Sequence, residues 1–533
     1  MEKLPVSYCE KEMIWSGAKK KLEYDDDTSA GEIIFNNMRN WPKHVCQICD
    51  TDGVTVTFEQ ALSWAIRMAQ VFKKRGLTHK DIIGIVAENS TYLMPLAVAC
   101  LLNGTPFHSP ISIMDKENLK NVFLQTKPGL IFCDGNEYEK VQAATIEWQP
   151  EIFTITDHLE GVSSIEALLV PTDSEQFYRP EPLQEGGKQT VAILCSSGTT
   201  GPPKCAHFSS TRLISQTLLD CGPVLFSTTS LSWMSGLWFL MVTTALRTTR
   251  LITKNPFTPL YILQLVEKYK VSCLSVSPAN TVALINFPGA TAEVLTSIRY
   301  LLLGGTIIFP ATVQRSRELF KGAIVTTIYG MTESGVIASG IGNDKAVGWP
   351  APGVRVRIVD EKGENLGHNQ IGEVYAHTGE TWKGYFENPE ETSRMQDPEG
   401  WFHTGDLGYF DERHYLYLVD RRRSTLKYQY VHYWPGEIEN VISELKEVQN
   451  VCVVGIHNEL TGDEAGALVV TKKESVISAK DIIDHVARRL PGVHRQLHAG
   501  VQFTEELPVN PNGKTDRKAA RDIFIALIAA AKL

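Results

Sequence analysis

The N-terminal half of the chain alternates between short apolar runs and amphipathic segments. A capping-box sequence at 57–60 (TFEQ) opens a segment whose apolar residues recur at helical spacing, which predicts a helix. The run DIIGIVAEN at 81–89 predicts a buried strand, and the apolar segment 91–104 predicts the next helix. Further strands are expected at 129–135, 190–198 and 271–278, and a further helix at 261–269. This order predicts an α/β fold with largely parallel sheets.

The pattern changes near Gly353. Residues 353–375 alternate with period two between glycine turns, which predicts a smaller β-rich subdomain. The cationic run 421–423 (RRR) follows, and a buried strand would not tolerate it, so we expect a domain boundary there. The sequence predicts an N-terminal domain, residues 1–420, of two α/β subdomains plus the β-rich one. Residues 421–533 are predicted to form a small α+β C-terminal domain.

Composition excludes several classes of protein. The chain has 533 residues, 43% apolar and 21% charged, as is ordinary for a globular protein of more than one domain. A net charge of −9 argues against a general nucleic-acid binder. The longest uncharged stretch, 221–246, is interrupted by Pro223 and several serines and threonines, so it predicts buried structure and not a membrane span. The first residues include charged side chains and no long apolar run, so no secretory leader is expected.

The cysteines indicate a reducing compartment. Ten cysteines in a chain of this length do not make a disulfide scaffold. Cys46 and Cys49 form a C-x-x-C, but they precede an Asp52-Gly53 turn and the run VTVTF, which predicts a β-hairpin. A redox or metal site is the alternative for this pair, and no second C-x-x-C completes it.

The strongest local signal is the segment 196–204, SSGTTGPPK, directly after the apolar run VAILC. Its glycines allow a tight turn and close approach to a ligand. Hydroxyls and backbone N–H groups supply donors for phosphate oxygens, and Lys204 adds a cation. Composition alone fits a surface turn equally well. The predicted phosphate-binding residues are Ser196, Ser197, Gly198, Thr199, Thr200, Gly201 and Lys204.

This segment resembles the signature loop of the adenylate-forming enzymes, which include acyl-CoA synthetases, 4-coumarate-CoA ligases and insect luciferases. Further family motifs follow in family order. They are the glycine pair 304–305, the YGxTE-like run 329–334, a block made of the pairs 372–373 and 384–385 with the run 389–392, the W-x-x-T-G-D block 401–406, the hinge-like pair 420–421 and the PNGK run 511–514. The resemblance spans roughly residues 57 to 518, and its ordered set is far more specific than any single motif.

The resemblance implies that a carboxylate attacks the α-phosphorus of ATP, giving an acyl-adenylate and pyrophosphate. Thr332 is then expected to hydrogen-bond the α-phosphate, and Glu333 to help hold Mg²⁺. Asp406 is expected to accept the ribose hydroxyls, and Lys514 to be carried in on the C-terminal domain to the reaction centre. Besides the loop, the implied ATP-binding residues are Gly304, Gly305, Tyr329, Gly330, Thr332, Asp406, Arg421 and Lys514.

A second step is implied, in which coenzyme A replaces AMP to give an acyl-CoA. The family rotates its mobile small domain after adenylation, so that a second face meets the thiol. Arg423 stands at the pivot position, and Lys427 is the cation expected on the second face. Thr332 and Arg421 complete the expected catalytic set with the two lysines.

Three positions depart from the family pattern. Cys205 and Tyr430 stand where the family usually has glycine, and a tyrosine at position 430 could obstruct coenzyme A. Trp233 stands near a common histidine position, so we assign Trp233 and Gly236 to the acyl pocket, with an ordinary core tryptophan as the alternative. An apolar wall follows, with no Arg or His placed for a second polar group, which favours a fatty or aromatic acid.

Other functions remain open. A luciferase-type monooxygenase shares the adenylation step, and a degenerate binder of adenylates would fit the departures at Cys205 and Tyr430. An amino-acid-activating module would have a carrier domain downstream of residue 533. The tripeptide 531–533 (AKL) resembles the Ser-Lys-Leu address, which predicts a peroxisomal location and binding to the import receptor.

Overall fold

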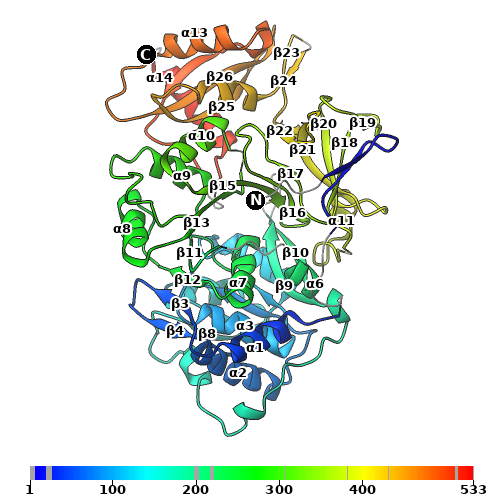
Figure 1. Cartoon of the computed structure of the whole chain (residues 1–533), viewed down its shortest axis with the longest axis vertical. Helices are drawn as coiled ribbons and strands as arrows, with labels where there is room; N and C mark the ends of the chain where they lie inside the picture. Colours follow the sequence, from blue (N-terminus) through cyan, green and yellow to red (C-terminus); the bar gives the residue numbers. More distant parts are fainter. Residues whose placement is uncertain are drawn as a thin grey trace.

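The computed structural model describes residues 6–19, 27–196, 203–215, 221–306, 308–380, 382–429, 431–510 and 514–531. These residues form a mixed α/β structure, in which the chain runs from a lower α/β region to a small C-terminal domain at the opposite end (Figure 1). The predicted fold class is therefore confirmed. The boundary after Asp420 falls near the end of β22 (Leu416–Arg421) and stays a prediction.

The first sheet has the order β10-β9-β6-β5-β7-β8 and is parallel except at β10. Its strands are β5 (Ile83–Val86), β6 (Phe107–His108), β7 (Leu130–Cys133), β8 (Glu151–Thr154), β9 (Thr190–Ser196) and β10 (Lys204–Ser209). The helices of this region are α1 (Ala30–Asn40), α2 (Phe58–Lys74), α3 (Leu93–Asn103), α4 (Lys116–Thr126), α5 (Tyr138–Ala144) and α6 (Ser210–Ser215).

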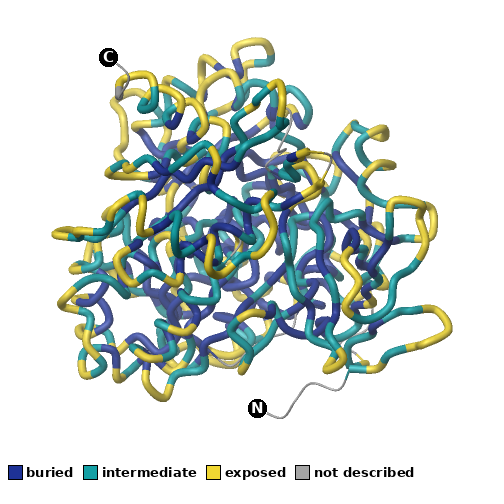
Figure 2. The backbone as a smooth tube through the Cα atoms, turned by 90° about the horizontal axis from the view of Figure 1, so that it is seen from above, coloured by how far each residue is buried: buried dark blue, intermediate teal, exposed yellow. Residues whose placement is uncertain are grey.

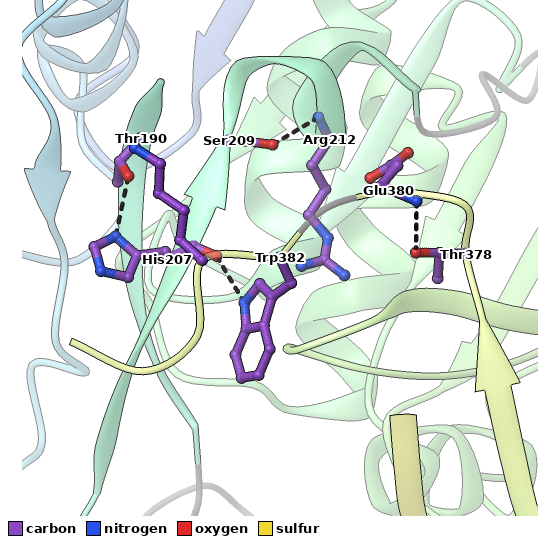
Figure 3. A pocket seen from close by; sticks show the side chains of 8 residues that line it. Thr190, His207, Ser209, Arg212, Thr378, Glu380 and Trp382 are labelled. Atoms are coloured by element: carbon purple, nitrogen blue, oxygen red, sulfur yellow. Dashed lines mark hydrogen bonds between the residues drawn. The ribbon is translucent and has the colours of Figure 1, made fainter. Parts of the chain in front are cut away.

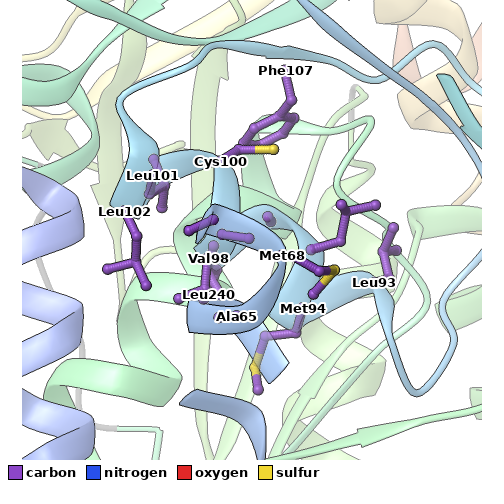
Figure 4. Close-up of a cluster of buried hydrophobic side chains, with 14 of the residues drawn as sticks. Ala65, Met68, Leu93, Met94, Val98, Cys100, Leu101, Leu102, Phe107 and Leu240 are labelled. Carbon is purple, nitrogen blue, oxygen red and sulfur yellow. The ribbon is translucent and has the colours of Figure 1, made fainter. Parts of the chain in front are cut away.

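Helix α2 begins where the sequence predicts. Thr57 accepts the N–H of Gln60, and the Gln60 side chain accepts the N–H of Thr57 in return, so two end groups of the helix are satisfied. The apolar face of α2 packs on α3, and their side chains form a core with Leu240 (Figure 4). Side chains on α2 and α3 that fill this core include Ala65, Met68, Leu93, Met94, Val98 and Cys100.

The second sheet has the order β17-β16-β15-β14-β13-β11-β12-β3-β4. Its strands are β3 (Val45–Cys49), β4 (Thr55–Thr57), β11 (Val224–Ser227), β12 (Thr249–Ile252), β13 (Cys273–Ser275), β14 (Tyr300–Gly304), β15 (Ile324–Met331), β16 (Gly335–Gly340) and β17 (Trp349–Pro350). Its helices are α7 (Met234–Leu246), α8 (Pro259–Tyr269), α9 (Pro278–Ile285) and α10 (Pro310–Leu319).

The β-rich region forms a third sheet, as predicted. Its order is β1-β2-β18-β20-β21-β22, with β19 on β18. The strands are β1 (Ser7–Cys9), β2 (Ile14–Ser16), β18 (Arg355–Val359), β19 (Asn365–Leu366), β20 (Gly372–His377), β21 (Phe402–Phe410) and β22, and α11 (Pro389–Met395) lies beside them. Figure 1 shows this sheet at one side of the second sheet.

The C-terminal domain is a fourth sheet with helices. Its order is β24-β23-β26-β25, with β27 parallel to β26. Its elements are β23 (Leu426–Tyr428), β24 (Val431–Tyr433), α12 (Pro435–Ile442), β25 (Val448–Asn458), β26 (Gly462–Thr471), α13 (Ala479–Arg489), β27 (Gly500–Phe503) and α14 (Arg517–Ala531). The N–H of Gly436 in α12 donates to Asp420 Oδ2 at 2.9 Å, so this domain contacts the end of β22 directly.

Two further predictions are confirmed. Cys46 and Cys49 lie on β3 of the antiparallel β3–β4 hairpin, and the Cys46 thiol donates to the Val56 carbonyl at 3.3 Å. The stretch 221–246 ends in the largely buried helix α7. Among the described residues, no helix is both long and apolar enough to cross a membrane. Buried backbone fills the interior, and exposed loops line the rim (Figure 2).

Candidate functional site

The centre of the candidate site is Asp406 on β21. Its register partner on β22 is Arg421, whose Nε lies 3.2 Å from Asp406 Oδ1. From the end of β15, the Tyr329 hydroxyl donates to Asp406 Oδ2 at 2.7 Å. The β21–β22 pairing and the end of β15 therefore bring together Asp406, Arg421 and Tyr329, which the sequence analysis assigned to one bound nucleotide.

Burial sets the protonation of this centre. Burial and the charge of Asp406 raise the pKa of Tyr329 well above its usual value, so the phenol stays protonated and donates. Burial also raises the pKa of Asp406, although the charge of Arg421, the hydrogen bond from Tyr329 and the charge of Lys514 oppose that rise. Tyr329 and Arg421 therefore hold the two oxygens of the Asp406 side chain, and each carboxylate oxygen has a second lone pair that can accept a hydroxyl.

Lys514 lies at the same centre although it belongs to the C-terminal domain. Burial and the charge of Arg421 lower the pKa of Lys514, and the charges of Asp406 and Glu333 oppose the lowering. Its backbone is fixed by Asn510, whose side chain accepts the Lys514 N–H at 3.1 Å. The ammonium group is therefore within electrostatic reach of both carboxylates, as the two-domain hypothesis requires.

A second cluster surrounds Tyr385, which sequence reasoning did not assign to the site. The Tyr385 hydroxyl donates to Glu333 Oε1 at 2.5 Å, and Ser196 also hydrogen-bonds this hydroxyl. The Lys204 ammonium lies 5.3 Å from the centre of the Tyr385 ring and pairs with Glu391. Tyr385 thus connects both described ends of the 196–204 segment with Glu333. Its position after Gly384 in a family-like block was the available signal.

The remaining nucleotide residues lie at strand ends. Gly304 ends β14, and a Cβ there would lie 2.8 Å from the Ile328 carbonyl oxygen, while Gly305 has a φ of +93°. Gly330 belongs to β15, and Thr332 follows it in the turn that carries Glu333, whose side chain is buried. The predicted residues Ser197, Gly198, Thr199, Thr200 and Gly201 lie outside the described residues, as does Tyr430.

The two residues predicted for domain rotation follow β22, where the chain enters the C-terminal sheet. Arg423 lies in the turn Arg422–Ser424 after β22 and is exposed. Lys427 is exposed on β23, and its N–H donates to Asp463 Oδ2 at 3.2 Å. The structure thus brings Lys514 to the nucleotide residues and leaves Lys427 on the C-terminal sheet.

The predicted acyl-pocket residues frame the start of α7. Trp233 immediately precedes the helix and is half-buried. A Cβ on Gly236 would lie 1.9 Å from the Ser230 carbonyl oxygen, so the close approach there requires glycine. On the neighbouring β12, the buried Arg250 lines a small pocket with Phe239 of α7, and burial lowers the pKa of Arg250 to about 10. This cation differs from the sequence expectation of a wholly apolar wall.

Another small pocket lies beside β9 and β10 (Figure 3). The Trp382 indole donates to the His207 carbonyl at 3.2 Å, and Thr190 and His207 hydrogen-bond at 3.0 Å. Burial lowers the pKa of His207 to about 4, so the imidazole is neutral. None of the predicted site residues lines this pocket, whose walls are Thr190, His207, Ser209, Arg212, Thr378, Glu380, Trp382 and Lys383.

Two family models match most of the chain. A family model described as AMP-binding enzyme matches residues 34–386, and one described as AMP-binding enzyme C-terminal domain matches residues 437–514. The chain is 25% identical to luciferin 4-monooxygenase of Photinus pyralis over 534 residues, covering 94% of this chain and 95% of that protein. It is 26% identical to a probable CoA ligase of Humulus lupulus over 540 residues, covering 96% of each. The fold of ATP-bound MatB from Rhodopseudomonas palustris superposes with a TM-score of 0.82 at 24% identity, over 93% of this chain and 100% of that one.

Proposed function

Because the chain belongs to the family of AMP-binding enzymes, which form adenylates, we propose that it is an ATP-dependent carboxylic acid:CoA ligase. The reaction would be acid plus ATP to acyl-adenylate and pyrophosphate, followed by attack of coenzyme A to give acyl-CoA and AMP. The observation that supports this proposal most strongly is the convergence of Lys514 with Asp406 and Glu333 from separate domains.

In adenylation, the proposed site residues would bind ATP and stabilise the negative charge that develops. Asp406 and Tyr329 would hold the ribose and adenine side of ATP, and Thr332 would donate to the α-phosphate. Negative charge accumulates where the carboxylate meets the phosphorus, so a fixed ammonium group from Lys514 stabilises the transition state. Lys204, which pairs with Glu391 at the described end of the 196–204 segment, would exchange that partner for the outer phosphates.

Magnesium fits beside these groups. Mg²⁺ in such sites is held by one or two carboxylates together with substrate phosphates. Glu333 supplies one buried carboxylate next to Thr332, with Tyr385 fixing one of its oxygens. Glu333 would hold and orient the ion, which would supply charge to neutralise the phosphates.

The second step would use the other face of the small domain. With the boundary after Asp420, rotation about Arg423 would withdraw Lys514 and present β23 with Lys427 to the thiol. For the acid we propose a fatty or aromatic chain, because α7 offers mainly apolar side chains near Trp233. Because the Arg250 cation could pair with a second carboxylate, a short dicarboxylic acid is the substrate to compare with fatty and aromatic acids.

Two half-reactions measured separately test the proposal. Exchange of labelled pyrophosphate into ATP is followed over fatty, aryl and dicarboxylic acids, and thioester formation is scored with coenzyme A. Exchange that depends on an added acid, followed by acyl-CoA, is the expected result. Acid-dependent exchange without thioester would contradict the ligase, and absence of exchange with every acid would favour a degenerate binder. Light on adding luciferin, ATP and O₂ would favour a monooxygenase.

Lys427 separates the two steps. The variant Lys427→Ala is expected to keep acid-dependent exchange and to lower thioester formation roughly tenfold or more, because the side chain acts only after rotation. Lys446→Ala, a change of another exposed lysine in the same domain, is the control. Equal loss of both half-reactions in Lys427→Ala would contradict the two-face mechanism.

The pH dependence of adenylation reports on Lys514. Its pKa lies below that of a free lysine, so the ammonium group is lost as the pH rises through that lowered value. The exchange rate is therefore expected to fall at a lower pH than the one at which a free lysine would titrate. The variant Lys514→Arg, which stays charged, should retain a flat alkaline profile over its residual activity. The same fall in both proteins would exclude Lys514 as its origin.

The peroxisomal location also remains our proposal. It is supported by the tripeptide 531–533 alone, of which Lys532 and Leu533 lie outside the described residues. A fluorescent protein that carries α14 and the tripeptide 531–533 at its C-terminus should reach peroxisomes. The same fusion with Lys532→Glu should remain outside them.

A further inference from the structure

Three metal-ligand side chains converge at the strands that carry Ser196 and Lys204. They are His108 on β6, Cys195 on β9 and Cys205 on β10. His108 Nε2 lies 3.3 Å from the sulfur of Cys195 and 3.8 Å from the sulfur of Cys205. All three ligand atoms lie within 4.8 Å of one another. His108 and Cys205 are fully buried, and Cys195 is half-buried.

The sheet register explains this convergence. His108 pairs with Ile193 across β6 and β9, and Cys195 lies two residues further along β9, on the same face. Cys205 is the direct antiparallel partner of Cys195. Neighbours on one face of a sheet have close Cβ atoms, so the three side chains meet without any local distortion.

His108 is oriented as a metal ligand. Its Nδ1 lies 2.9 Å from the Thr126 hydroxyl, and that hydroxyl donates to the Val122 carbonyl at 3.4 Å. A hydroxyl that donates elsewhere accepts from the imidazole, so Nδ1 carries the proton and the Nε2 lone pair faces the sulfurs. Ligand histidines in metal sites are held in this way through their second nitrogen.

We propose that His108, Cys195 and Cys205 bind a zinc ion. Zinc bonds of about 2.3 Å to sulfur and about 2.0 Å to nitrogen place tetrahedral ligand atoms roughly 3.5–3.8 Å apart. The separations of 3.3 and 3.8 Å from Nε2 are close to that spacing. Three protein ligands leave the fourth position to water.

Zinc there would have a consequence for the neighbouring loop. The ion would join β6, β9 and β10 at the residues next to Ser196 and Lys204. This site is separate from Glu333, and neither adenylation nor thioester formation needs it.

Metal analysis of the full chain tests the site without any assay of turnover. The purified protein is incubated with zinc chloride, passed through metal-free buffer and analysed for zinc. About one zinc per chain is expected, with a roughly tenfold or greater loss in Cys195→Ser and in Cys205→Ser. The double variant Cys46→Ser/Cys49→Ser is the control and should keep the metal, because that pair belongs to the β3–β4 hairpin.

Two further measurements do not depend on how well the cysteine variants fold. Cobalt chloride added to the metal-free wild type should give a thiolate-to-cobalt charge-transfer band. Thr126→Val, which removes only the hydroxyl behind His108, should weaken zinc binding by roughly 10–100-fold, and Thr126→Ser should restore it. With a reductant present throughout, a wild type that binds no zinc and gives no cobalt band, or that contains a Cys195–Cys205 disulfide, overturns the proposal.

Discussion

Replacing Lys514 by alanine is expected to lower the adenylation rate by roughly 10²–10³-fold, the range found when one preorganised donor is removed from a transition state. The ammonium group lies within electrostatic reach of Asp406 and Glu333, where the reacting carboxylate and phosphate would add negative charge. ATP affinity should change little, because Asp406, Tyr329 and the 196–204 segment are the residues that we propose hold the nucleotide. The measurement is acid-dependent pyrophosphate exchange at saturating ATP, beside a direct ATP-binding titration.

Lys518 provides the matched control for this variant. It is exposed on α14, a few residues beyond Lys514, and Lys518→Ala should leave exchange unchanged. If Lys514→Ala exchanged pyrophosphate at the wild-type rate, the pose in which Lys514 meets Asp406 would have no part in adenylation. A loss of ATP affinity with an unchanged exchange rate at saturating ATP would mean that Lys514 binds ATP and does not stabilise the transition state.

Removing the Arg517 side chain should cause the largest loss of stability in the C-terminal domain. Arg517 pairs with Glu439, which is 4% exposed and also accepts the Val453 N–H at 2.8 Å. Burial alone would lower the pKa of Arg517, but the charge and hydrogen bond of Glu439, together with the neighbouring Cys452 and Asp420, raise it. Arg517→Met leaves a buried carboxylate without its partner, and such losses cost about 3–5 kcal/mol. Urea unfolding of the full chain should show an earlier transition for this domain.

The double variant separates the pair from its surroundings. Replacing both residues, Arg517→Met with Glu439→Met, removes the unpaired charge and should recover much of the loss in the free energy of unfolding. A single Arg517→Met variant as stable as the wild type would mean that Glu439 finds another donor or water. Comparison of the three transitions therefore measures the coupling between these two side chains.

Much of the fold follows from local patterns. The capping box at Thr57 and the apolar face behind it specify α2 without knowledge of the rest of the chain. The short apolar runs predict strands of the first sheet, because buried parallel strands are continuously apolar. Strand order and partner choice do not follow from such patterns, since they depend on contacts far apart in the sequence.

The site shows the same division. Motif order predicted Asp406, Arg421 and Lys514, but the pairing of Asp406 with Arg421 comes from the β21–β22 register. Tyr385 was missed because its role depends on its neighbours in space: the described ends of the phosphate segment and Glu333. The cluster of His108, Cys195 and Cys205 was missed for the same reason, because β6 is far from β9 and β10 in the sequence.

Asp420 gives the position of the small domain a dependence on protons. Its carboxyl group is 2% exposed and accepts the N–H of Gly436 in α12. Burial raises the pKa of Asp420 against the charge of Arg517, and Glu439 adds to the rise. A swing of α12 would return this carboxyl group to water, where its affinity for a proton is lower. Protonation of Asp420 therefore favours the docked domain. We expect acidification to stabilise the docked position, and each undocking of the C-terminal domain to release a fraction of a proton.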